Sequence, residues 1–356
     1  MYKICNSTIK TINKKKFDRE SFLTSQPWRN PEEFLNVVLE SKWYFAISLF
    51  LSEIQINTRD FYKKYKFASI PMPITSSSIS SPFGLGSDSE PVQIELFNKT
   101  TYLSDSMQFH LEYLIRQKFK GVYYIMPTFR GENPDERHLN QFFHSELEID
   151  GTLDDVMNII DKYIKYCIKN IFIKYGELIE ELGGGVDHIE KFLDKNYTIP
   201  RISFEEALTI LECSPKFYKF VNKKIVNISA EGERALLKKF NGPVWIMYYP
   251  IQTVPFYQAW NSDNVHAMCA DLLMGIGEIV GCGQRHSTYL ETLVALDHHK
   301  VNRNEYEWYL KMKKEYPLQT SGFGMGIERL LLWLLNHNDI RDVTLFNRLK
   351  GYESAP

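Results

Sequence analysis

The sequence lacks the cysteine pattern of a zinc protein or of a disulfide-linked scaffold. Its five cysteines are scattered along 356 residues, without a CxxC pair or a Cys/His cluster. Zinc coordination is therefore not expected. An odd, dispersed set of thiols is typical of a chain that stays in a reducing compartment. The five are Cys5, Cys167, Cys213, Cys269 and Cys282.

A long apolar run and a secretory leader are missing as well. The most apolar helix-like stretch, Trp43 to Ile54, follows Lys42 and contains Glu53. It falls short of the roughly 20 residues that a membrane span needs. The N-terminus carries charges throughout and has no apolar leader core. We therefore expect a soluble, cytoplasmic protein that does not enter a membrane.

An excess of charge of one sign is the third absence. The chain has 42 Lys+Arg against 44 Asp+Glu, a formal net charge of −2. No global basic field points to nucleic acid. Hydrophobic residues make up 44% of the chain, which is enough for a large core in one big domain or two of ordinary size.

What the sequence does contain is a series of strand-like segments with helices between them. Residues 31–66 and 154–182 have apolar residues at helical spacing, and residues 122–150 predict an antiparallel hairpin. This order is typical of an α+β protein rather than of repeated βαβ units. We predict an N-terminal arm at 1–30, a main domain at 31–349 with a helical insertion at about 183–240, and a C-terminal tail at 350–356.

A dense group of charges follows the apolar strand-like segment VYYIM. It lies in FRGENPDERHL, Phe129 to Leu139. Arg130 stands at the strand end, where a guanidinium can pair with a phosphate. Arg137 and His138 lie across the hairpin, and Phe142 is placed to stack a base. Taken alone, a surface hairpin with mixed charges explains the stretch equally well.

Two further groups point to the same chemistry. Asp271 and Glu278 flank LLMGIG, and carboxylates on neighbouring strands can share Mg²⁺ held against phosphate oxygens. Taken alone, two unrelated acids near a turn are the more ordinary explanation. GFGMGIER places Arg329 at a helix start, where anions are attracted, although glycines for tight packing explain it equally well. Together the three groups predict a triphosphate and divalent-metal site without a P-loop or a Rossmann turn.

Four segments resemble one family. FRGENPDERHLNQFFHSELEID is similar to motif 2 of the class II aminoacyl-tRNA synthetases, and SGFGMGIERLLLWLLNHNDIRDVTLFNR resembles the asparaginyl version of their motif 3. ADLLMGIGEIVGCGQR and LSDSMQFHLE resemble elements of the aspartyl and asparaginyl subgroup. The resemblance covers residues 35–150 and 240–349. It implies a class II antiparallel sheet flanked by helices, and an ATP-dependent, AMP-forming ligase.

The resemblance also implies roles for individual residues. The residues that would hold ATP are Arg130, Glu132, Arg137, His138, Phe142 and Arg329, with Arg130 and Arg329 as the catalytic arginines. Those that would bind Mg²⁺ are Asp271 and Glu278. Those that would line the amino-acid pocket are Ser106, Gln108 and Arg285. Of these, Arg285 would read the substrate's side-chain carboxylate or amide, since an arginine can form a bidentate pair with a carboxylate.

The sequence departs from the family's pattern at two places. Gln141 stands where motif 2 has a glutamate, which removes a charge near the pocket. The Glu-Gly pair that helps the family's enzymes hold the substrate ammonium has no match in the serine-rich stretch Ser76 to Pro91. Pro73, in preference to Pro71, would be the motif 1 proline at a homodimer interface.

The acceptor of the activated amino acid is a separate question. The family's aspartyl and asparaginyl enzymes carry an anticodon-binding OB-fold before the catalytic core, and a motif 1-like helix that starts near residue 31 leaves no room for one. This plan resembles the archaeal asparagine synthetase related to these enzymes. We therefore expect first a tRNA-independent amide ligase that activates aspartate or an asparagine-like carboxylate and transfers it to ammonia or a small amine. Two alternatives stay open: an asparaginyl- or aspartyl-tRNA synthetase-like enzyme, and a non-catalytic regulatory paralogue.

Overall fold

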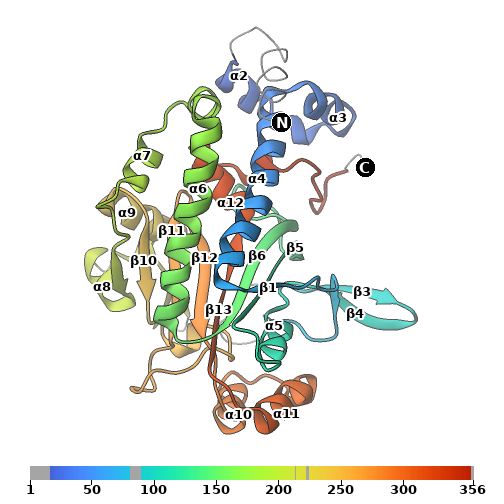
Figure 1. Cartoon of the computed structure of the whole chain (residues 1–356), viewed down its shortest axis with the longest axis vertical. Coiled ribbons are helices and arrows are strands. Elements are labelled where there is room, and N and C mark those ends of the chain that lie inside the picture. Colours follow the sequence, from blue (N-terminus) through green and yellow to red (C-terminus); the bar gives the residue numbers. More distant parts are fainter. Residues whose placement is uncertain (1–16, 81–89, 213, 222–223, 354–356) are drawn as a thin grey trace.

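The computed structural model describes residues 17–80, 90–212, 214–221 and 224–353. An eight-stranded sheet runs through the molecule (Figure 1). Its strands, in spatial order, are β1 (Ala68–Ser69), β5 (Gly121–Phe129), β6 (Gln141–Asp150), β13 (Thr320–Gly326), β12 (Gly277–Gln284), β11 (Cys269–Met274), β10 (Val244–Met247) and β7 (Arg201–Ser203). The two edge pairs are parallel, and the five pairs between them are antiparallel. The predicted α+β class with an antiparallel-dominated sheet is confirmed.

Helices pack around this sheet. They are α2 (Arg19–Thr24), α3 (Pro31–Glu40), α4 (Lys42–Tyr65), α5 (Gln108–Ile115), α6 (Leu153–Gly183), α7 (Asp187–Leu193), α8 (Phe204–Ile210), α9 (Ala230–Phe240), α10 (Tyr289–His298), α11 (Glu307–Glu315) and α12 (Ile327–Leu334). Short 3-10 turns are η1 (Pro27–Arg29), η2 (Pro215–Phe217), η3 (Ile251–Thr253), η4 (Arg303–Tyr306) and η5 (Ile340–Val343).

One face of the sheet is covered by the long helices α4 and α6 (Figure 1). A cluster of hydroxyl groups connects α4, α6 and the sheet: Tyr163 Oη of α6 lies 2.6 Å from Thr58 Oγ1 of α4 and 3.1 Å from Ser145 Oγ of β6. Thr152 caps the N-terminus of α6, and Gly184 ends the helix in the left-handed region at φ 75°. A glycine adopts that conformation without a Cβ penalty, and the helix predicted over 154–182 ends here.

A small hairpin precedes the motif region. The strands β3 (Val92–Leu96) and β4 (Lys99–Leu103) pair antiparallel, and β2 (Thr75–Ser76) joins β4. Phe97 and Asn98 form its two-residue turn with φ of 54° and 61°, the backbone that matches the twist of a hairpin. The serine-rich loop predicted at 76–91 falls largely on 81–89, outside the described residues.

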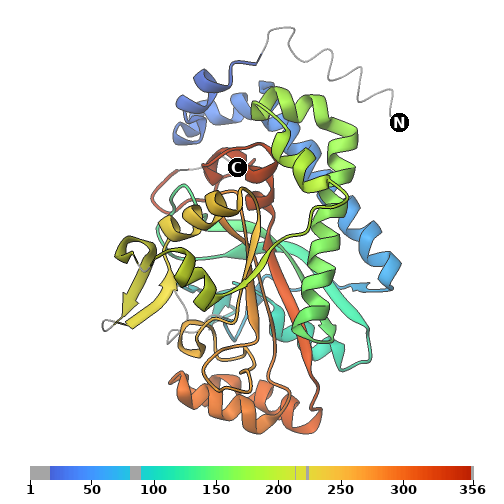
Figure 2. The ribbon, with the colours of Figure 1, turned by 90° about the vertical axis from the view of Figure 1, so that its left-hand side faces the viewer.

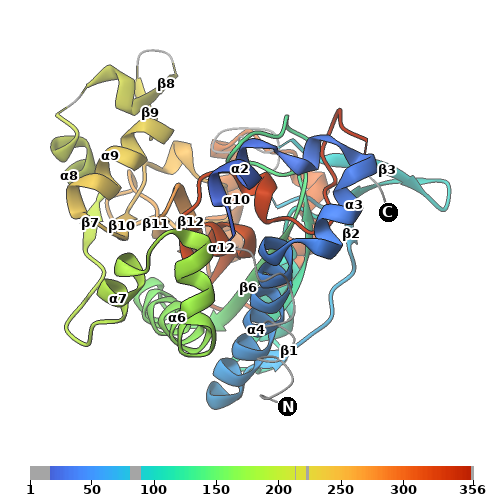
Figure 3. The same ribbon diagram turned by 90° about the horizontal axis from the view of Figure 1, so that it is seen from above.

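The predicted helical insertion at about 183–240 holds α7, α8 and α9. It also holds strands that were not predicted: β7, which joins the edge of the main sheet, and the hairpin of β8 (Tyr218–Val221) and β9 (Lys224–Ile228). Figures 2 and 3 show α8, α9 and this hairpin gathered on one side of the molecule. Strands of three to five residues show too few alternations to be told from loops by their period.

The predicted N-terminal arm is described from residue 17 onward and folds into α2 and η1. Arg19 of α2 donates to the carbonyl oxygen of Gly183 at 3.0 Å and to that of Asn336 at 2.7 Å. These carbonyls end α6 and the segment after α12, where a cation is favourable. The arm is thereby fastened to two helix ends.

Within the described ranges, no single helix is long and apolar enough to cross a membrane. The helices α3 and α4 meet that length and composition only as a pair, and they are bent by 71° at their junction.

Candidate active site

A cavity of about 450 Å³ opens over one end of the sheet. Its walls come from the β5–β6 hairpin, β12, β13, α12 and the insertion that carries α9. Seven of the eleven predicted site residues line it: Arg130, Glu132, Arg137, His138, Phe142, Glu278 and Arg329. Side chains up to 199 positions apart in the sequence are therefore gathered around one space.

The loop of the β5–β6 hairpin is organised by Asp135. Its Oδ1 accepts from the backbone N–H groups of Arg137 and His138, each at 2.8 Å, and lies 2.8 Å from Nδ1 of His138. These hydrogen bonds lower the pKa of Asp135, although burial opposes them. Asp135 was not among the predicted site residues. An aspartate whose side chain accepts from the N–H groups two and three residues later is typical of an Asx turn, and its position in the charged loop is the sequence signal for this turn.

Arg130 and Phe142 face each other across the mouth of the hairpin. The guanidinium carbon of Arg130 lies 5.5 Å from the centre of the Phe142 ring, within the range of a cation–π contact. Its Nη1 is 4.0 Å from Oε1 of Glu132. In the described part of the chain, Nε of Arg130 is buried without a hydrogen-bond partner. An unpaired N–H on a cation at a cavity wall fits an anionic ligand.

Arg329 joins the cavity from the first turn of α12. Its Nη1 donates to the carbonyl oxygen of Glu278, and its Nη2 donates to that of Arg137 at 3.3 Å. Burial, with the charges of Arg130 and Arg137 nearby, lowers the pKa of Arg329. Three guanidinium groups are thus held around one space, where the charges of Glu278 and Glu233 offset part of their mutual repulsion, and a bound anion would offset more of it.

The predicted metal pair lies on β11 and β12. A Cβ on Gly281 would stand 3.0 Å from Oε1 of Glu278 and 3.6 Å from Oδ1 of Asp271, so both carboxylates converge above this glycine. Burial, and then the charge of Glu278, raises the pKa of Asp271 well above its ordinary value. Among the described residues, no group of three or more His, Cys, Asp or Glu side chains is arranged to hold a metal ion. Two carboxylates suffice for Mg²⁺ when a substrate phosphate completes its shell.

Strand β6 leads from the cavity to the residues predicted for the amino-acid pocket. Because side chains alternate along a strand, four residues share the face away from α6: Phe142, His144, Glu146 and Glu148. His144 Nδ1 lies 3.0 Å from Oε1 of Glu146, and Ser106 Oγ donates to Oε2 of Glu146 at 2.8 Å. The predicted pocket residue Ser106 is thus two contacts from the cavity wall. His144, Glu146 and Glu148 were not predicted, although the alternation in FFHSELEID is their signal.

The glycines of β13 lie opposite this row, with Gly322 beside Glu148 and Gly324 beside Glu146. A Cβ on Gly322 would be 1.9 Å from Oε2 of Glu148 and 2.5 Å from the carbonyl oxygen of Leu147. A Cβ on Gly324 would be 3.5 Å from the nearest atom, an ordinary contact. Gly322 is therefore required by close packing, whereas Gly324 leaves open space above the sheet.

Arg285 is fully enclosed and already paired. Its Nε and Nη2 donate to the two carboxylate oxygens of Glu148 at 3.2 and 3.1 Å, and its Nη1 donates to Oε1 of Gln258 at 3.2 Å. Burial raises the pKa of Glu148 to about 7, against the lowering effect of Arg285. The structure thus places the predicted side-chain reader in a buried, bidentate ion pair.

Gln108, the third residue predicted for this pocket, belongs to a second buried group. Its Nε2 donates to Oε1 of Glu112 at 3.1 Å. Lys313 Nζ donates to Oε2 of Glu112 at 2.6 Å, and Tyr309 Oη to the same carboxylate at 2.9 Å. Although burial alone raises it, the cations Lys313 and Arg285 bring the pKa of Glu112 below its ordinary value. The carboxylate of Glu112 is saturated by donors from two helices.

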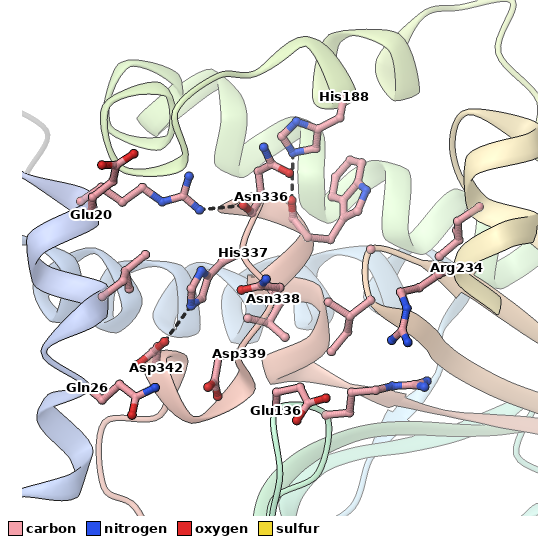
Figure 4. Close-up of a pocket in the computed structure, with 18 of the residues that line it drawn as sticks. Glu20, Gln26, Glu136, His188, Arg234, Asn336, His337, Asn338, Asp339 and Asp342 are labelled. Atoms are coloured by element: carbon pink, nitrogen blue, oxygen red, sulfur yellow. Dashed lines mark hydrogen bonds and ion pairs between the residues drawn. The ribbon is translucent and has the colours of Figure 1, made fainter. Parts of the chain in front are cut away.

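A second cavity, of about 1170 Å³, lies behind the hairpin loop (Figure 4). It shares Glu136, Arg137 and Arg234 with the first cavity. His337 Nε2 lies 2.8 Å from Oδ2 of Asp342 on its wall (Figure 4). Of the predicted site residues, Arg137 alone lines it. The smaller cavity is therefore the candidate active site.

The family described as tRNA synthetases class II (D, K and N) matches residues 32–350. The asparagine–tRNA ligase of Malacoplasma penetrans is 31% identical over 322 residues, which cover 86% of this chain and 71% of the relative. The asparagine–tRNA ligase of Lactobacillus delbrueckii subsp. bulgaricus is 29% identical over 316 residues, 87% of this chain and 70% of the relative.

Solved structures agree with these relatives. The asparaginyl-tRNA synthetase of Pyrococcus horikoshii, complexed with asparaginyl-adenylate, superposes with a TM-score of 0.81 at 26% identity and covers 92% of this chain and 74% of that chain. The asparaginyl-tRNA synthetase of Entamoeba histolytica gives a TM-score of 0.78 at 23% identity, covering 98% of this chain and 75% of that chain, a likeness of fold.

Proposed function

This chain belongs to the class II tRNA synthetases (D, K and N), and we propose from this premise that it activates asparagine with ATP and transfers it to tRNA. Membership makes it an ATP-dependent ligase of the class II aminoacyl-tRNA synthetase type, similar to asparaginyl-tRNA synthetases. Asparagine as the substrate and tRNA as the acceptor are the parts that we propose.

The observation that supports this proposal most is the gathering of Arg130, Arg137 and Arg329 around a cavity that also contains Phe142. Three cations with an aromatic ring match a nucleoside triphosphate. We infer that Phe142 stacks on adenine and that the arginines hold the phosphates.

The pair of Arg285 and Glu148 supports asparagine over aspartate. Three of the five N–H groups of Arg285 are used by Glu148 and Gln258. The remaining donors, beside a carboxylate acceptor, match an amide, which has one acceptor oxygen and a donating NH₂ group. With a pKa of about 7, Glu148 is ionised in part at neutral pH and increasingly above it, and the ionised form would repel a substrate carboxylate at the same place.

The chemistry that we propose has two steps. A carboxylate oxygen of asparagine attacks the α-phosphorus of ATP, and the bond to pyrophosphate breaks to leave asparaginyl-adenylate. A terminal ribose hydroxyl of tRNA then attacks the activated carbonyl carbon, and AMP leaves. No protein nucleophile is needed, because positioning and positive charge at the phosphate supply the catalysis.

Asp271 and Glu278 fit a divalent cation. Burial and the neighbouring charge of Glu278 raise the pKa of Asp271, and a cation shared by the two carboxylates would relieve that repulsion. Mg²⁺, when bound there, would neutralise phosphate charge and orient the polyphosphate. Pro73 and the neighbouring Ile74 are exposed; a homodimer through this segment and a cytoplasmic location remain predictions.

The acceptor was expected to be ammonia or a small amine, with tRNA as the alternative. The names of the relatives favour the alternative. The test is ATP–pyrophosphate exchange with asparagine and with aspartate, followed by product analysis with a tRNA-Asn transcript or ammonia. We expect exchange with asparagine and aminoacylated tRNA. Exchange with aspartate and formation of free asparagine from ammonia would instead establish the amide ligase.

A matched pair of variants tests whether Glu148 selects the amide of asparagine over the carboxylate of aspartate. Glu148→Gln removes the carboxylate that would repel aspartate, so we expect the ratio of asparagine to aspartate exchange to fall. Glu206→Gln changes an exposed glutamate that caps α8 and should leave the ratio unchanged. An unaltered ratio in Glu148→Gln would show that Glu148 does not discriminate between the two substrates.

A further inference from the structure

The insertion does not stand apart from the candidate active site, because α9 forms one of its walls. Its first turn is fixed in place. Ser229 Oγ accepts from the backbone N–H of Gly232 at 3.2 Å, and a Cβ on Gly232 would lie 2.5 Å from the carbonyl oxygen of Phe217. A turn packed this closely holds the next residue, Glu233, in a defined position.

Glu233 points at the hairpin loop. Its carboxylate forms an ion pair with the guanidinium of Arg137 across 96 positions of sequence. Only 12% of the Arg137 side chain and 17% of the Glu233 side chain are exposed. A Cβ on Gly277 would overlap both groups, at 2.3 Å from Arg137 and 2.4 Å from Glu233. Glycine at 277 leaves the space in which the pair meets.

The charge of Glu233 is only partly compensated by its surroundings. Burial raises its pKa, and so does the charge of Glu278, while Arg137 and Arg329 act in the opposite direction. The carboxylate of Glu233 and a terminal phosphate of the nucleotide would compete for the guanidinium of Arg137, because that group can form a bidentate pair with one anion at a time on the same side.

We propose that Glu233 is a positioning residue that occupies the phosphate-binding face of Arg137 when no nucleotide is bound and yields it to the polyphosphate of ATP. The insertion would thereby hold Arg137 extended into the cavity and set the affinity for ATP. This inference rests on the proposed function, since it assigns Arg137 to the phosphates of the same site.

The first experiment compares Glu233→Gln with the wild type in ATP binding and in asparagine-dependent pyrophosphate exchange. Because the competing charge is removed, we expect the Kd and KM for ATP to fall by about three- to tenfold, the range of the net contribution of one hydrogen bond. The KM for asparagine and kcat should stay within about twofold. A structural role alone would change all three parameters or none.

Two variants serve as controls. Glu205→Gln removes another ionic contact of the insertion, to Nε2 of His266 at 2.6 Å, without touching Arg137, and should leave the KM for ATP unchanged. Glu233→Asp keeps the charge and should stay closer to the wild type than Glu233→Gln. Unchanged or weaker ATP binding in Glu233→Gln overturns the inference.

A measurement on the wild type covers the case in which Glu233→Gln does not fold. A crystal of the whole chain soaked with inorganic tripolyphosphate should show Arg137 turned from Glu233 to the phosphate. An intact Arg137–Glu233 pair beside bound tripolyphosphate overturns the inference. If no amino acid supported pyrophosphate exchange, the proposed function would be wrong. The measurement of ATP binding would still decide the role of Glu233.

Discussion

The nucleotide end and the amino-acid end of the site lie on one face of one sheet, yet their charges are arranged differently. At the nucleotide end, Arg130 and Arg329 surround an open cavity of about 450 Å³ and are held mainly by carbonyl and ring contacts. At the amino-acid end, Arg285 and Lys313 are fully enclosed and bound to Glu148 and Glu112.

Under the proposed function, the difference follows from what each end would bind. A triphosphate brings several negative charges, so the protein can leave cations partly uncompensated and exposed to water until the ligand arrives. A neutral side chain brings none, so the charges around it must neutralise one another before it binds, because an unpaired buried charge is costly. The first end is therefore open and the second is closed.

The largest effect on stability is expected from Lys313→Met. It leaves the buried carboxylate of Glu112 without its ammonium partner, and a broken buried pair costs about 3–5 kcal/mol. Urea unfolding measures the loss. The double variant Glu112→Gln/Lys313→Met removes both charges and should recover most of it. A double variant as unstable as the single would show that packing, rather than charge, decides this end.

A smaller effect is expected from glycine substitutions along β13. Gly322→Ala forces a Cβ against Glu148 and the backbone of Leu147, and overpacking of this kind costs about 1–3 kcal/mol. Gly324→Ala meets only ordinary contacts and should unfold like the wild type. Thermal unfolding of the two variants in parallel tests the contrast, which equal melting temperatures would contradict.

Phe142→Ala tests the open end through binding. The ring is half-buried at the cavity, and stacking on a base is worth about 1–3 kcal/mol. We expect the KM for ATP to rise by about ten- to a hundredfold at that energy, with little change in the KM for asparagine. Pyrophosphate exchange with each substrate varied in turn gives both constants. A rise in the KM for asparagine alone would show that adenine does not stack on Phe142.

A pH dependence of stability is expected from Glu328, whose two carboxylate oxygens accept from the backbone N–H of Phe143 at 3.1 Å. Burial raises its pKa to about 7. The native state therefore keeps a proton that the unfolded state releases at lower pH, so this contribution to stability is present in acid and is lost as pH rises through 7. Urea unfolding between pH 5 and 8 should show a shallower decline for Glu328→Gln. Parallel curves would assign the decline to other groups.

Much of the open end could be predicted from the sequence. Strand and turn patterns placed Arg130 and Phe142 on one hairpin and Arg329 at a strand–helix junction, because these are local structures, and the family resemblance assigned all three to one site. Glu233 could not be predicted in the same way. It lies in a segment whose short strands carry little periodicity, and its contact to Arg137 depends on how the insertion packs on the sheet.

The sequence by itself determined the α+β class, the main strands and the residues that the family motifs contain, because these follow from spacing within a few turns or strands of chain. Only the tertiary structure decided which charge neutralises which. Arg285 pairs with Glu148 across 137 positions and Lys313 with Glu112 across 201. Such partners are chosen by the packing of sheet and helices, which no local pattern in the chain specifies.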